Sequence, residues 1–341
     1  MAIIVMLYPK SRLEAAKIEL PADMTFRFLE SYSHEAIIEA CRGADCLLLP
    51  AMVASLPEAV LNQLSDIKLI QCPGAGFDHI DLEATARIGI PVANAPGQNL
   101  ASVAEFTIGL IIALQRQIIV SDHNIKSGNY QVFREQLLNQ GITEIGGSRV
   151  GLIGLGAIGY QTARLLHMLN ASVSYYAKSR KSPEVEESLH IEYRSFEELL
   201  AASDVVSIHV PLTAETREML GRRELGLMKH GSLLINTARG EIINQADLAE
   251  SLENGHLGGA AIDTLYPEPP KADHPLLNLS LAAKNRLLLT PHVAGVTVGA
   301  FRRMMSVAFE NMKCAAQGKS INHVVNGINR LGGHRTSSEG L

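Results

Sequence analysis

The sequence predicts an α/β fold with two doubly wound parallel-sheet domains, and three observations lead to this prediction. The chain has 341 residues, more than one hydrophobic core usually organises. Short apolar runs alternate with helical patterns in two separate blocks, which is typical of parallel sheets covered by helices on both faces. The second block opens with a glycine-rich turn between a strand and a helix.

The first hundred residues alternate apolar runs with helical patterns. We predict strands at 3–8, 46–50, 67–72 and 90–94. We predict helices at 11–19, 33–43, 57–64 and 81–88. A long apolar helix then follows at 102–118, with Ser102 and Glu105 forming a capping box at its start.

The second block contains six predicted strands, the content expected of a doubly wound nucleotide-binding sheet. They lie at 149–154, 172–177, 205–210, 232–237, 259–263 and 286–291. After the first strand, Gly154, Gly156 and Gly159 follow the order G-x-G-x-x-G. The turn, which includes Ala157 and Ile158, would place backbone N–H groups and the positive end of a helix dipole against a pyrophosphate. In this strand–turn–helix context the motif predicts a bound dinucleotide.

The last predicted helix, at 297–317, has no strand partner in the second block, so we expect it to return to the first. This predicts a discontinuous substrate-binding domain of residues 1–100 plus 297–330 and a dinucleotide-binding domain of residues 101–296. A cleft between two such domains is the expected place for an active site. The polar residues 331–341 are predicted to be a disordered tail.

The residues after the second strand of the second block predict which dinucleotide binds. NAD-binding folds place an acidic residue about 20 residues after the glycine turn, where it binds the ribose hydroxyls. At that distance from Gly159 this chain has Ala177, followed by a basic run. The run consists of Lys178, Ser179, Arg180 and Lys181. Because lysine and arginine attract a 2′-phosphate that a carboxylate would repel, we predict NADP(H) as the preferred cofactor, with NAD(H) as the second, and Arg180 as the main phosphate contact.

Composition and charge argue against several other classes of protein. The formal net charge of −5 argues against general binding to nucleic acid or membrane surfaces, because both are polyanions. The four cysteines form no C-x-x-C pair and lie near no histidine at zinc-ligand spacing, so no metal site is predicted. The N-terminus predicts a strand rather than a signal peptide, and we expect a cytoplasmic protein.

Three polar residues follow strands of the second block. Arg239 lies in a loop after one strand, Glu268 in a proline-rich loop after the next, and His292 after the last. Open α/β sheets bind their ligands beyond the carboxyl ends of the strands. Converging there, the three residues predict a carboxylate binder, a partner for a histidine, and an acid–base histidine.

From about residue 65 to 325 the chain resembles the D-isomer-specific 2-hydroxyacid dehydrogenases. The matching segments stand in the family's order: GAGFDHIDLEA (74–84), IPVANAPGQNLASVAE (90–105), GLIGLGAIG, SDVVSIHVPLTAET (203–216), LLINTARGEI, GAAIDTLYPEPP and LLLTPHVAG. The basic run is similar to that of the NADPH-using glyoxylate/hydroxypyruvate reductases in this family. The resemblance implies a flavodoxin-like substrate domain, a Rossmann dinucleotide domain, and an oxidoreductase that interconverts small 2-keto and 2-hydroxy acids.

The resemblance also implies roles for individual residues and a homodimer paired through the helix at 102–118. Arg239 would clamp the substrate carboxylate, and the backbone of Gly74, Ala75 and Gly76 would bind it too. His292 would be the catalytic acid and base, and Glu268 would hydrogen-bond its ring. Residues expected to line the cofactor groove are His209, Val210, Pro211, Thr237 and Ala238, with Asp263 at the nicotinamide carboxamide.

Two features depart from the family's pattern, and other activities stay open. Phe106 stands where the SVAE motif is often followed by histidine, and the segment between Glu268 and His292 is long. A dinucleotide-sensing, corepressor-like protein could keep the same three polar residues. Phosphite and phosphoglycerate dehydrogenases of the same fold are further alternatives, although no arginine directly precedes Gly74 to hold a substrate phosphate.

Overall fold

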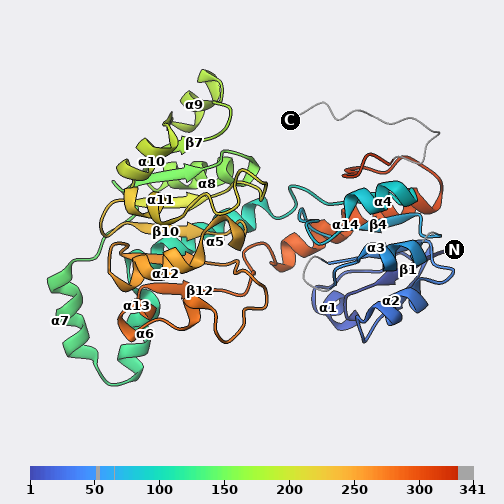
Figure 1. The fold of residues 1–341 in the computed structure, drawn as a ribbon, viewed down its shortest axis with the longest axis horizontal. Helices are drawn as coiled ribbons and strands as arrows, with labels where there is room; N and C mark the ends of the chain where they lie inside the picture. The colour runs from blue at the N-terminus through green and yellow to red at the C-terminus, as the bar shows by residue number, and fades with distance from the viewer. Residues whose placement is uncertain (51–53, 65, 329–341) are drawn as a thin grey trace. The chain divides into compact units, whose positions relative to one another are not determined.

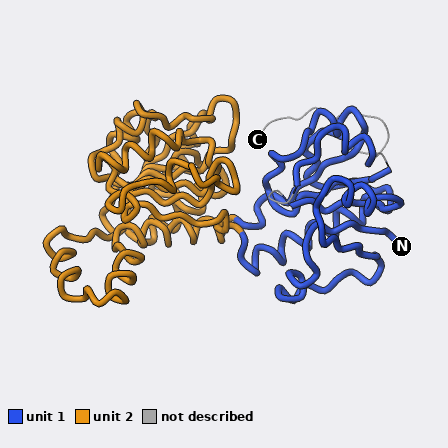
Figure 2. The backbone as a smooth tube through the Cα atoms, turned by 60° about the horizontal axis from the view of Figure 1, so that its bottom comes forward, with its two compact units in different colours: residues 1–99, 296–341 blue, residues 100–295 orange. Residues whose placement is uncertain are grey.

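The computed structural model describes residues 1–50, 54–64 and 66–328, and the chain divides into two compact units (Figure 2). Unit 1 comprises Met1–Asn99 and Val296–Leu341, and unit 2 comprises Leu100–Gly295. Each unit contains one sheet whose neighbouring strands are all parallel. The predicted α/β class with two parallel sheets is therefore confirmed. The predicted tail at 331–341 lies outside the described residues.

Unit 1 is built on a five-stranded sheet with the order β2-β1-β3-β4-β5 (Figure 1). Its strands are β1 (Ala2–Met6), β2 (Met24–Phe28), β3 (Cys46–Leu48), β4 (Leu69–Gln71) and β5 (Val92–Ala93). Its helices are α1 (Lys10–Ala15), α2 (His34–Cys41), α3 (Glu58–Leu61), the 3-10 turn η1 (Asn62–Leu64), α4 (Leu82–Ile88) and α14 (Val298–Ala316). The sequence did not predict β2, because this edge strand is mostly half-exposed and carries Thr25 and Arg27 instead of an apolar run.

Helices cover both faces of the unit 1 sheet. Alternate residues of a strand point to opposite faces, so one strand contributes side chains to two core clusters. Ile4 and Met6 of β1 lie in a core cluster with Phe301 and Met305 of α14. Val5, between them in sequence, lies in the cluster on the other face, which includes the buried apolar residues of α2, α3 and α4. The last long helix of the chain therefore completes the core of the first sheet.

Unit 2 is built on a seven-stranded sheet with the order β12-β11-β10-β9-β6-β7-β8. Its strands are β6 (Arg149–Ile153), β7 (Ser172–Tyr176), β8 (Ile191–Tyr193), β9 (Val205–Ile208), β10 (Leu233–Asn236), β11 (Gly259–Ile262) and β12 (Leu287–Leu289). The sequence predicted six of these and missed β8, a three-residue edge strand with one buried residue. The chain runs outward from β6 and then crosses back to β9 beside it, which makes a topological switch point where such sheets bind ligands.

The helices of unit 2 form a layer on each face of this sheet (Figure 1). One layer includes α5 (Leu100–Gln115), α8 (Ala157–Met168) and α9 (Pro183–Leu189). The other includes α10 (Phe196–Ala202), α11 (Arg222–Leu227), α12 (Gln245–Glu253), α13 (Leu281–Lys284) and the 3-10 turns η2 (Gly240–Ile242) and η3 (Pro275–Leu277).

The prediction of one helix over 102–118 is wrong at both ends. The helix α5 begins at Leu100, so Ser102 lies buried inside it and cannot cap it. It ends at Gln115, because Gln117 adopts a left-handed backbone conformation with φ of 47°. Apolar residues resume directly after this break, at Ile118 and Ile119, and for that reason the sequence did not reveal it.

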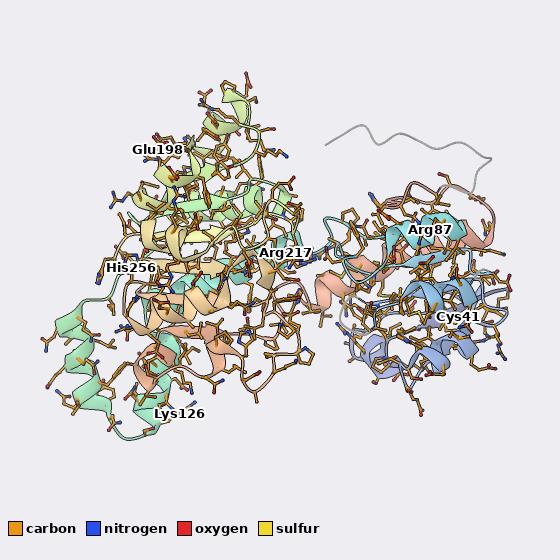
Figure 3. All side chains as sticks on the ribbon, in the orientation of Figure 1. Cys41, Arg87, Lys126, Glu198, Arg217 and His256 are labelled. Atoms are coloured by element: carbon orange, nitrogen blue, oxygen red, sulfur yellow. The ribbon has the colours of Figure 1, made fainter. Side chains whose placement is uncertain are left out.

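After the break, α6 (Ile118–Lys126) and α7 (Tyr130–Gln140) form a helical hairpin that projects from the rest of unit 2 (Figure 1). We call residues 118–140 the arm. No residue of α6 is buried in the described structure, and side chains such as Lys126, which pairs with Asp122, stand out from it (Figure 3). Among residues 1–50, 54–64 and 66–328, no single helix is long and apolar enough to cross a membrane, and α5 with α6 reaches that length only with a 55° bend.

Candidate active site

The glycine-rich turn joins β6 to α8 and has room for a phosphate group. Gly154 has φ of 100°, and a Cβ atom there would lie 2.8 Å from the backbone of His209. A Cβ on Gly159 would lie 2.3 Å from the Gly154 oxygen, so this glycine allows α8 to pack closely. Gly156, by contrast, has no described atom within 4 Å of its Cβ position, and no described side chain caps the α8 N-terminus that begins there. The open space at Gly156, where α8 begins, fits a dinucleotide pyrophosphate.

The loop after β9 packs against the glycine-rich turn. The His209 N–H donates to Ile153 O at 2.7 Å, and a Val210 methyl lies 2.9 Å from the Cβ position of Gly154. His209 Nε2 lies 3.0 Å from Ser207 Oγ. Although the residue keeps partial solvent exposure, the protein around its ring lowers the pKa of His209 to about 4 by desolvation, so the imidazole is neutral at pH 7. Pro211 continues the same loop.

The loop after β10 is held by Asn236, the last residue of that strand. Asn236 is buried; its Oδ1 accepts from Ala238 N at 2.9 Å and its Nδ2 donates to Arg239 O at 2.8 Å. Thr237 Oγ1 contacts Thr107 Oγ1 of α5 at 3.2 Å, and Arg239 Nη1 donates to Ala238 O at 2.8 Å. These bonds position the Arg239 side chain at the carboxyl edge of the sheet.

The loops after β10 and β11 touch through Gly240. A Cβ atom on Gly240 would lie 2.4 Å from the carbonyl carbon of Leu265, closer than any real side chain allows. Only glycine therefore permits the backbone that follows Arg239 to lie directly on the loop that leads to Glu268.

Glu268 and His292 form the pair that the sequence predicted only with reservation. His292 Nδ1 lies 2.9 Å from Glu268 Oε2, and Glu268 Oε1 accepts from Leu265 N at 2.8 Å. The carboxylate is therefore fixed by its own loop and oriented toward the histidine. The long segment between the two residues does not prevent their pairing.

Asp263 holds the backbone of the histidine turn. His292 has φ of 53°, a left-handed conformation that costs a non-glycine residue about 1 kcal/mol. His292 N donates to Asp263 O at 2.7 Å, and Asp263 Oδ1 accepts from Thr290 Oγ1 at 2.6 Å. The Asp263 carboxylate also accepts from Val293 N and Ala294 N and is 1% exposed. Its predicted contact with the nicotinamide carboxamide stays a prediction.

The basic run after β7 is exposed, and one of its members is already paired. Arg180 donates to Glu186 of α9 through Nε at 2.8 Å and Nη2 at 2.7 Å, and its guanidinium lies over the Tyr193 ring. The hydrogen bonds from Arg180 and then from Tyr175 hold the pKa of Glu186 at about 2. In the loop after β9, a hydrogen bond from Thr213 is the main cause that lowers the pKa of Glu215. The nearby charge of Lys178 lowers it further.

The sequence missed several residues that position this site. Asn236 and Thr290 hold the two loops of unit 2 that carry Arg239 and His292, and Glu186 holds Arg180. Asn236 had a detectable signal, because it is a polar residue that ends a buried apolar strand. Glu186 lies on α9, the helix that follows the basic run, and its distance in sequence from Arg180 does not identify the two residues as partners.

The remaining predicted residues lie away from these loops in sequence. Gly74, Ala75 and Gly76 follow β4 in unit 1, where Gly74 O accepts from Ala95 N at 3.0 Å and Ala75 O from the Asn94 side chain at 2.9 Å. Their role in substrate binding stays a prediction. Phe106 is partly buried on α5 and packs against the core of unit 2.

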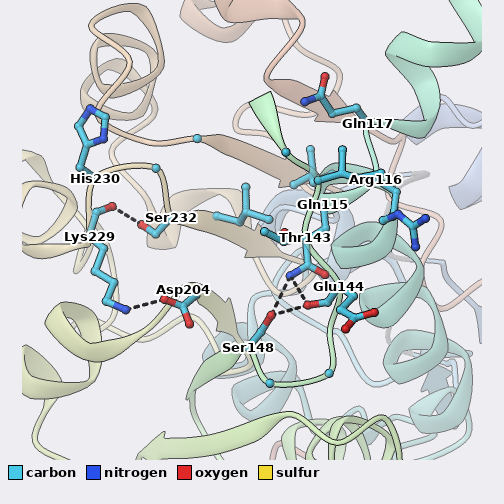
Figure 4. A pocket seen from close by; sticks show the side chains of 18 residues that line it. Gln115, Arg116, Gln117, Thr143, Glu144, Ser148, Asp204, Lys229, His230 and Ser232 are labelled. Atoms are coloured by element: carbon cyan, nitrogen blue, oxygen red, sulfur yellow. Dashed lines mark hydrogen bonds and ion pairs between the residues drawn. The ribbon is translucent and has the colours of Figure 1, made fainter. Parts of the chain in front are cut away.

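A hollow of about 780 Å³ opens at the opposite edge of the unit 2 sheet (Figure 4). Its lining includes Ser148, Asp204 and Ser232, which precede β6, β9 and β10 at their amino ends, and Gln115 at the base of the arm. Arg239, Glu268 and His292 instead follow their strands, so we place the chemistry at the carboxyl edge and not in this hollow. The described part of the chain holds no group of three or more His, Cys, Asp or Glu side chains arranged for a metal ion.

Comparisons with known proteins agree with this geometry. The model of the NAD binding domain of D-isomer specific 2-hydroxyacid dehydrogenases matches residues 108–294. The glyoxylate reductase of Aeropyrum pernix is 36% identical over 296 residues, 86% of each chain. The structure of the TT0316 protein from Thermus thermophilus has a TM-score of 0.82 and 30% identity, covering 95% of this chain and 100% of that one. Apo D-mandelate dehydrogenase from Rhodotorula graminis also has a TM-score of 0.82, with 26% identity and coverage of 95% and 97%.

The resemblance in the sequence is confirmed, and with it a nicotinamide dinucleotide cofactor and an oxidoreductase activity on 2-hydroxy acids. The chain belongs to the family of D-isomer specific 2-hydroxyacid dehydrogenases.

Proposed function

We propose that the protein is an NADP(H)-dependent reductase of small 2-keto acids such as glyoxylate or hydroxypyruvate. The observation that carries the proposal is the Glu268–His292 pair, 2.9 Å apart at the same sheet edge as Arg239 and the glycine-rich turn. A histidine oriented by a carboxylate can exchange a proton with a carbonyl oxygen. The similarity to a glyoxylate reductase supports the substrate class.

The pair determines which ring nitrogen of His292 acts. A carboxylate only accepts hydrogen bonds, so Nδ1 carries a proton and Nε2 is the atom that protonates the substrate oxygen. In the oxidative direction Nε2 takes that proton back. Arg239 binds the substrate carboxylate through parallel N–H donors, and Gly74–Gly76 add backbone donors. The dinucleotide, when bound, supplies the hydride.

The basic run supports NADP(H) over NAD(H). The chain has Ala177 and then cations where a ribose-binding carboxylate would otherwise stand. Because Glu186 already binds the Arg180 fork, we expect Lys178 and Ser179 to contact the 2′-phosphate directly. Arg180 would then contribute its charge while it shares its donors with Glu186.

A panel of 2-keto acids assayed with NADPH and NADH in parallel tests the proposal. We expect turnover with glyoxylate or hydroxypyruvate and a kcat/KM ratio for NADPH over NADH above about ten, because lysine and arginine pair with the phosphate. Lys178→Ala should lower this ratio, whereas Lys284→Ala, which removes a lysine from α13, should leave it unchanged.

Three other outcomes would contradict parts of the proposal. A ratio below one would overturn the cofactor preference. Faster turnover of phosphohydroxypyruvate would favour a phosphoglycerate dehydrogenase, the activity named for an Archaeoglobus fulgidus relative that is 35% identical over 78% of this chain and 49% of its own length. Tight NADPH binding without turnover of any 2-keto acid would favour a dinucleotide-sensing protein.

We further propose that the protein is a homodimer and that the arm covers the partner subunit. The sequence pointed to the long apolar helix, but α5 is largely buried within its own unit. The arm carries six exposed large apolar side chains, whereas α5 carries one, Ile112, and a second copy would cover those of the arm. They are Ile118, Ile119, Ile125, Tyr130, Val132 and Leu138.

Light scattering should give twice the chain mass of 36.9 kDa. Val132→Glu places a charge on the arm, at a side chain that is 73% exposed in the single chain, and should produce monomers without unfolding. Met168→Glu on α8, where the side chain is also 73% exposed, is the matched control and should stay dimeric. A monomeric mass for the unmodified protein would contradict the proposal.

A further inference from the structure

The long segment between Glu268 and His292 contains a second histidine that the sequence did not single out. His274 is 4% exposed, and both of its ring nitrogens have partners. Nδ1 accepts from Leu276 N at 3.2 Å and so caps η3, while Nε2 lies 3.1 Å from Tyr266 O. Because an amide N–H can only donate, Nδ1 carries no proton, and the proton on Nε2 is donated to the Tyr266 carbonyl.

The Tyr266 carbonyl belongs to the loop that carries Glu268. One residue before it, Leu265 N donates to Glu268 Oε1 at 2.8 Å, and two residues after it stands Glu268 itself. Gln245 Nε2 also lies 3.4 Å from the same carbonyl, at the limit of a hydrogen bond. The bond from His274 is therefore the shorter of the two side-chain contacts that hold this carbonyl.

We infer that His274 is a positioning residue, whose bond to the Tyr266 carbonyl holds Glu268 at hydrogen-bonding distance from His292. The inference rests on the proposed roles of Glu268 and His292. The bond joins the first part of the long segment, six residues after Glu268, to the loop before Glu268, so this part of the segment supports the pair instead of loosening it. Loss of the bond lets the Glu268 carboxylate move away from the imidazole, and a carboxylate at greater distance stabilises the charged ring less.

Two substitutions separate this role from the capping of η3. His274→Gln can place an amide N–H near the position of Nε2, and so retains a donor for Tyr266 O while losing the cap. His274→Asn can place its oxygen near the position of Nδ1, and so retains the cap but does not reach Tyr266 O. Both variants fill less of the buried site, so we expect a general loss of stability in both of them, and it does not distinguish one from the other.

The readout is the pH dependence of kcat/KM for 2-keto acid reduction, measured with the full chain. Reduction needs the protonated histidine, so activity falls as pH rises through a midpoint. For Glu268→Gln we expect that midpoint about one unit lower, because the ring loses its anionic partner. His274→Asn should move the midpoint in the same direction and lower kcat/KM about tenfold, since small displacements of catalytic groups have effects of this size. His274→Gln should keep the wild-type midpoint.

Three results separate the inference from the proposed function. An unchanged midpoint in His274→Asn, beside a lowered one in Glu268→Gln, would overturn the inference and leave the proposed function standing. Equal midpoint shifts in both His274 variants would also overturn it, because the cap or the packing would then be responsible. Absence of 2-keto acid reduction by the wild-type protein would instead overturn the proposed function. Ser280→Ala removes the cap of the neighbouring helix α13 and should lower thermal stability without moving the midpoint.

Discussion

Replacing His292 by asparagine is expected to lower kcat/KM for 2-keto acid reduction by about 10²–10⁴-fold, the usual contribution of a positioned general acid. An asparagine amide cannot protonate the substrate oxygen in the working pH range. The backbone should be unaffected, because asparagine accepts the φ of 53° found at this position and the bond to Asp263 O uses the backbone N–H. Steady-state assays at saturating NADPH, together with NADPH binding by calorimetry, would measure both properties.

The same substitution at another histidine controls for backbone effects. His323 also has a left-handed backbone, with φ of 59°, and lies exposed in unit 1. His323→Asn should keep wild-type activity, and NADPH affinity should stay within a few-fold in both variants. If His292→Asn retained more than about a tenth of wild-type activity, His292 would not be the general acid.

The sequence predicted the carboxyl edge of the second sheet because each catalytic candidate follows an apolar strand. Arg239, Glu268 and His292 come after β10, β11 and β12, and the parallel topology brings these strand ends to one edge. Strand order, hydrophobic runs and glycine spacing are local properties of the chain, so they can be read without a structure. The edge strands β2 and β8 escaped detection because one-sided or slight burial leaves no apolar run.

The bonds between loops could not be predicted in this way. The contacts of Asn236 with Arg239 O, of Asp263 with the histidine turn, and of His274 with Tyr266 O depend on backbone positions that only the folded loops define. The sequence does not show whether a polar loop residue faces solvent or forms a hydrogen bond with a backbone carbonyl. The same limit applies to Arg180, whose position in the basic run predicted a phosphate contact but gave no sign of its ion pair with Glu186.

Replacing Arg239 by alanine is expected to lower kcat/KM for the 2-keto acid by about 10²–10³-fold, because the substrate carboxylate loses a charged fork in a partly buried site. NADPH affinity should stay within a few-fold, since the proposed phosphate contacts lie after β7 and not after β10. Arg239→Lys should show an intermediate loss, because lysine keeps the charge but not the two parallel donors.

Substrate selectivity distinguishes a carboxylate binder from a residue that merely supports its loop. If Arg239 binds the carboxylate, Arg239→Ala should lose most of the preference for glyoxylate over a small aldehyde without a carboxylate, and added guanidinium should restore part of the activity. Arg164→Ala removes an exposed arginine from α8 and should change neither property. Equal losses for the acid and the aldehyde would contradict the assignment, because damage to the loop lowers both rates alike, whereas removal of a carboxylate partner lowers only the rate of the acid.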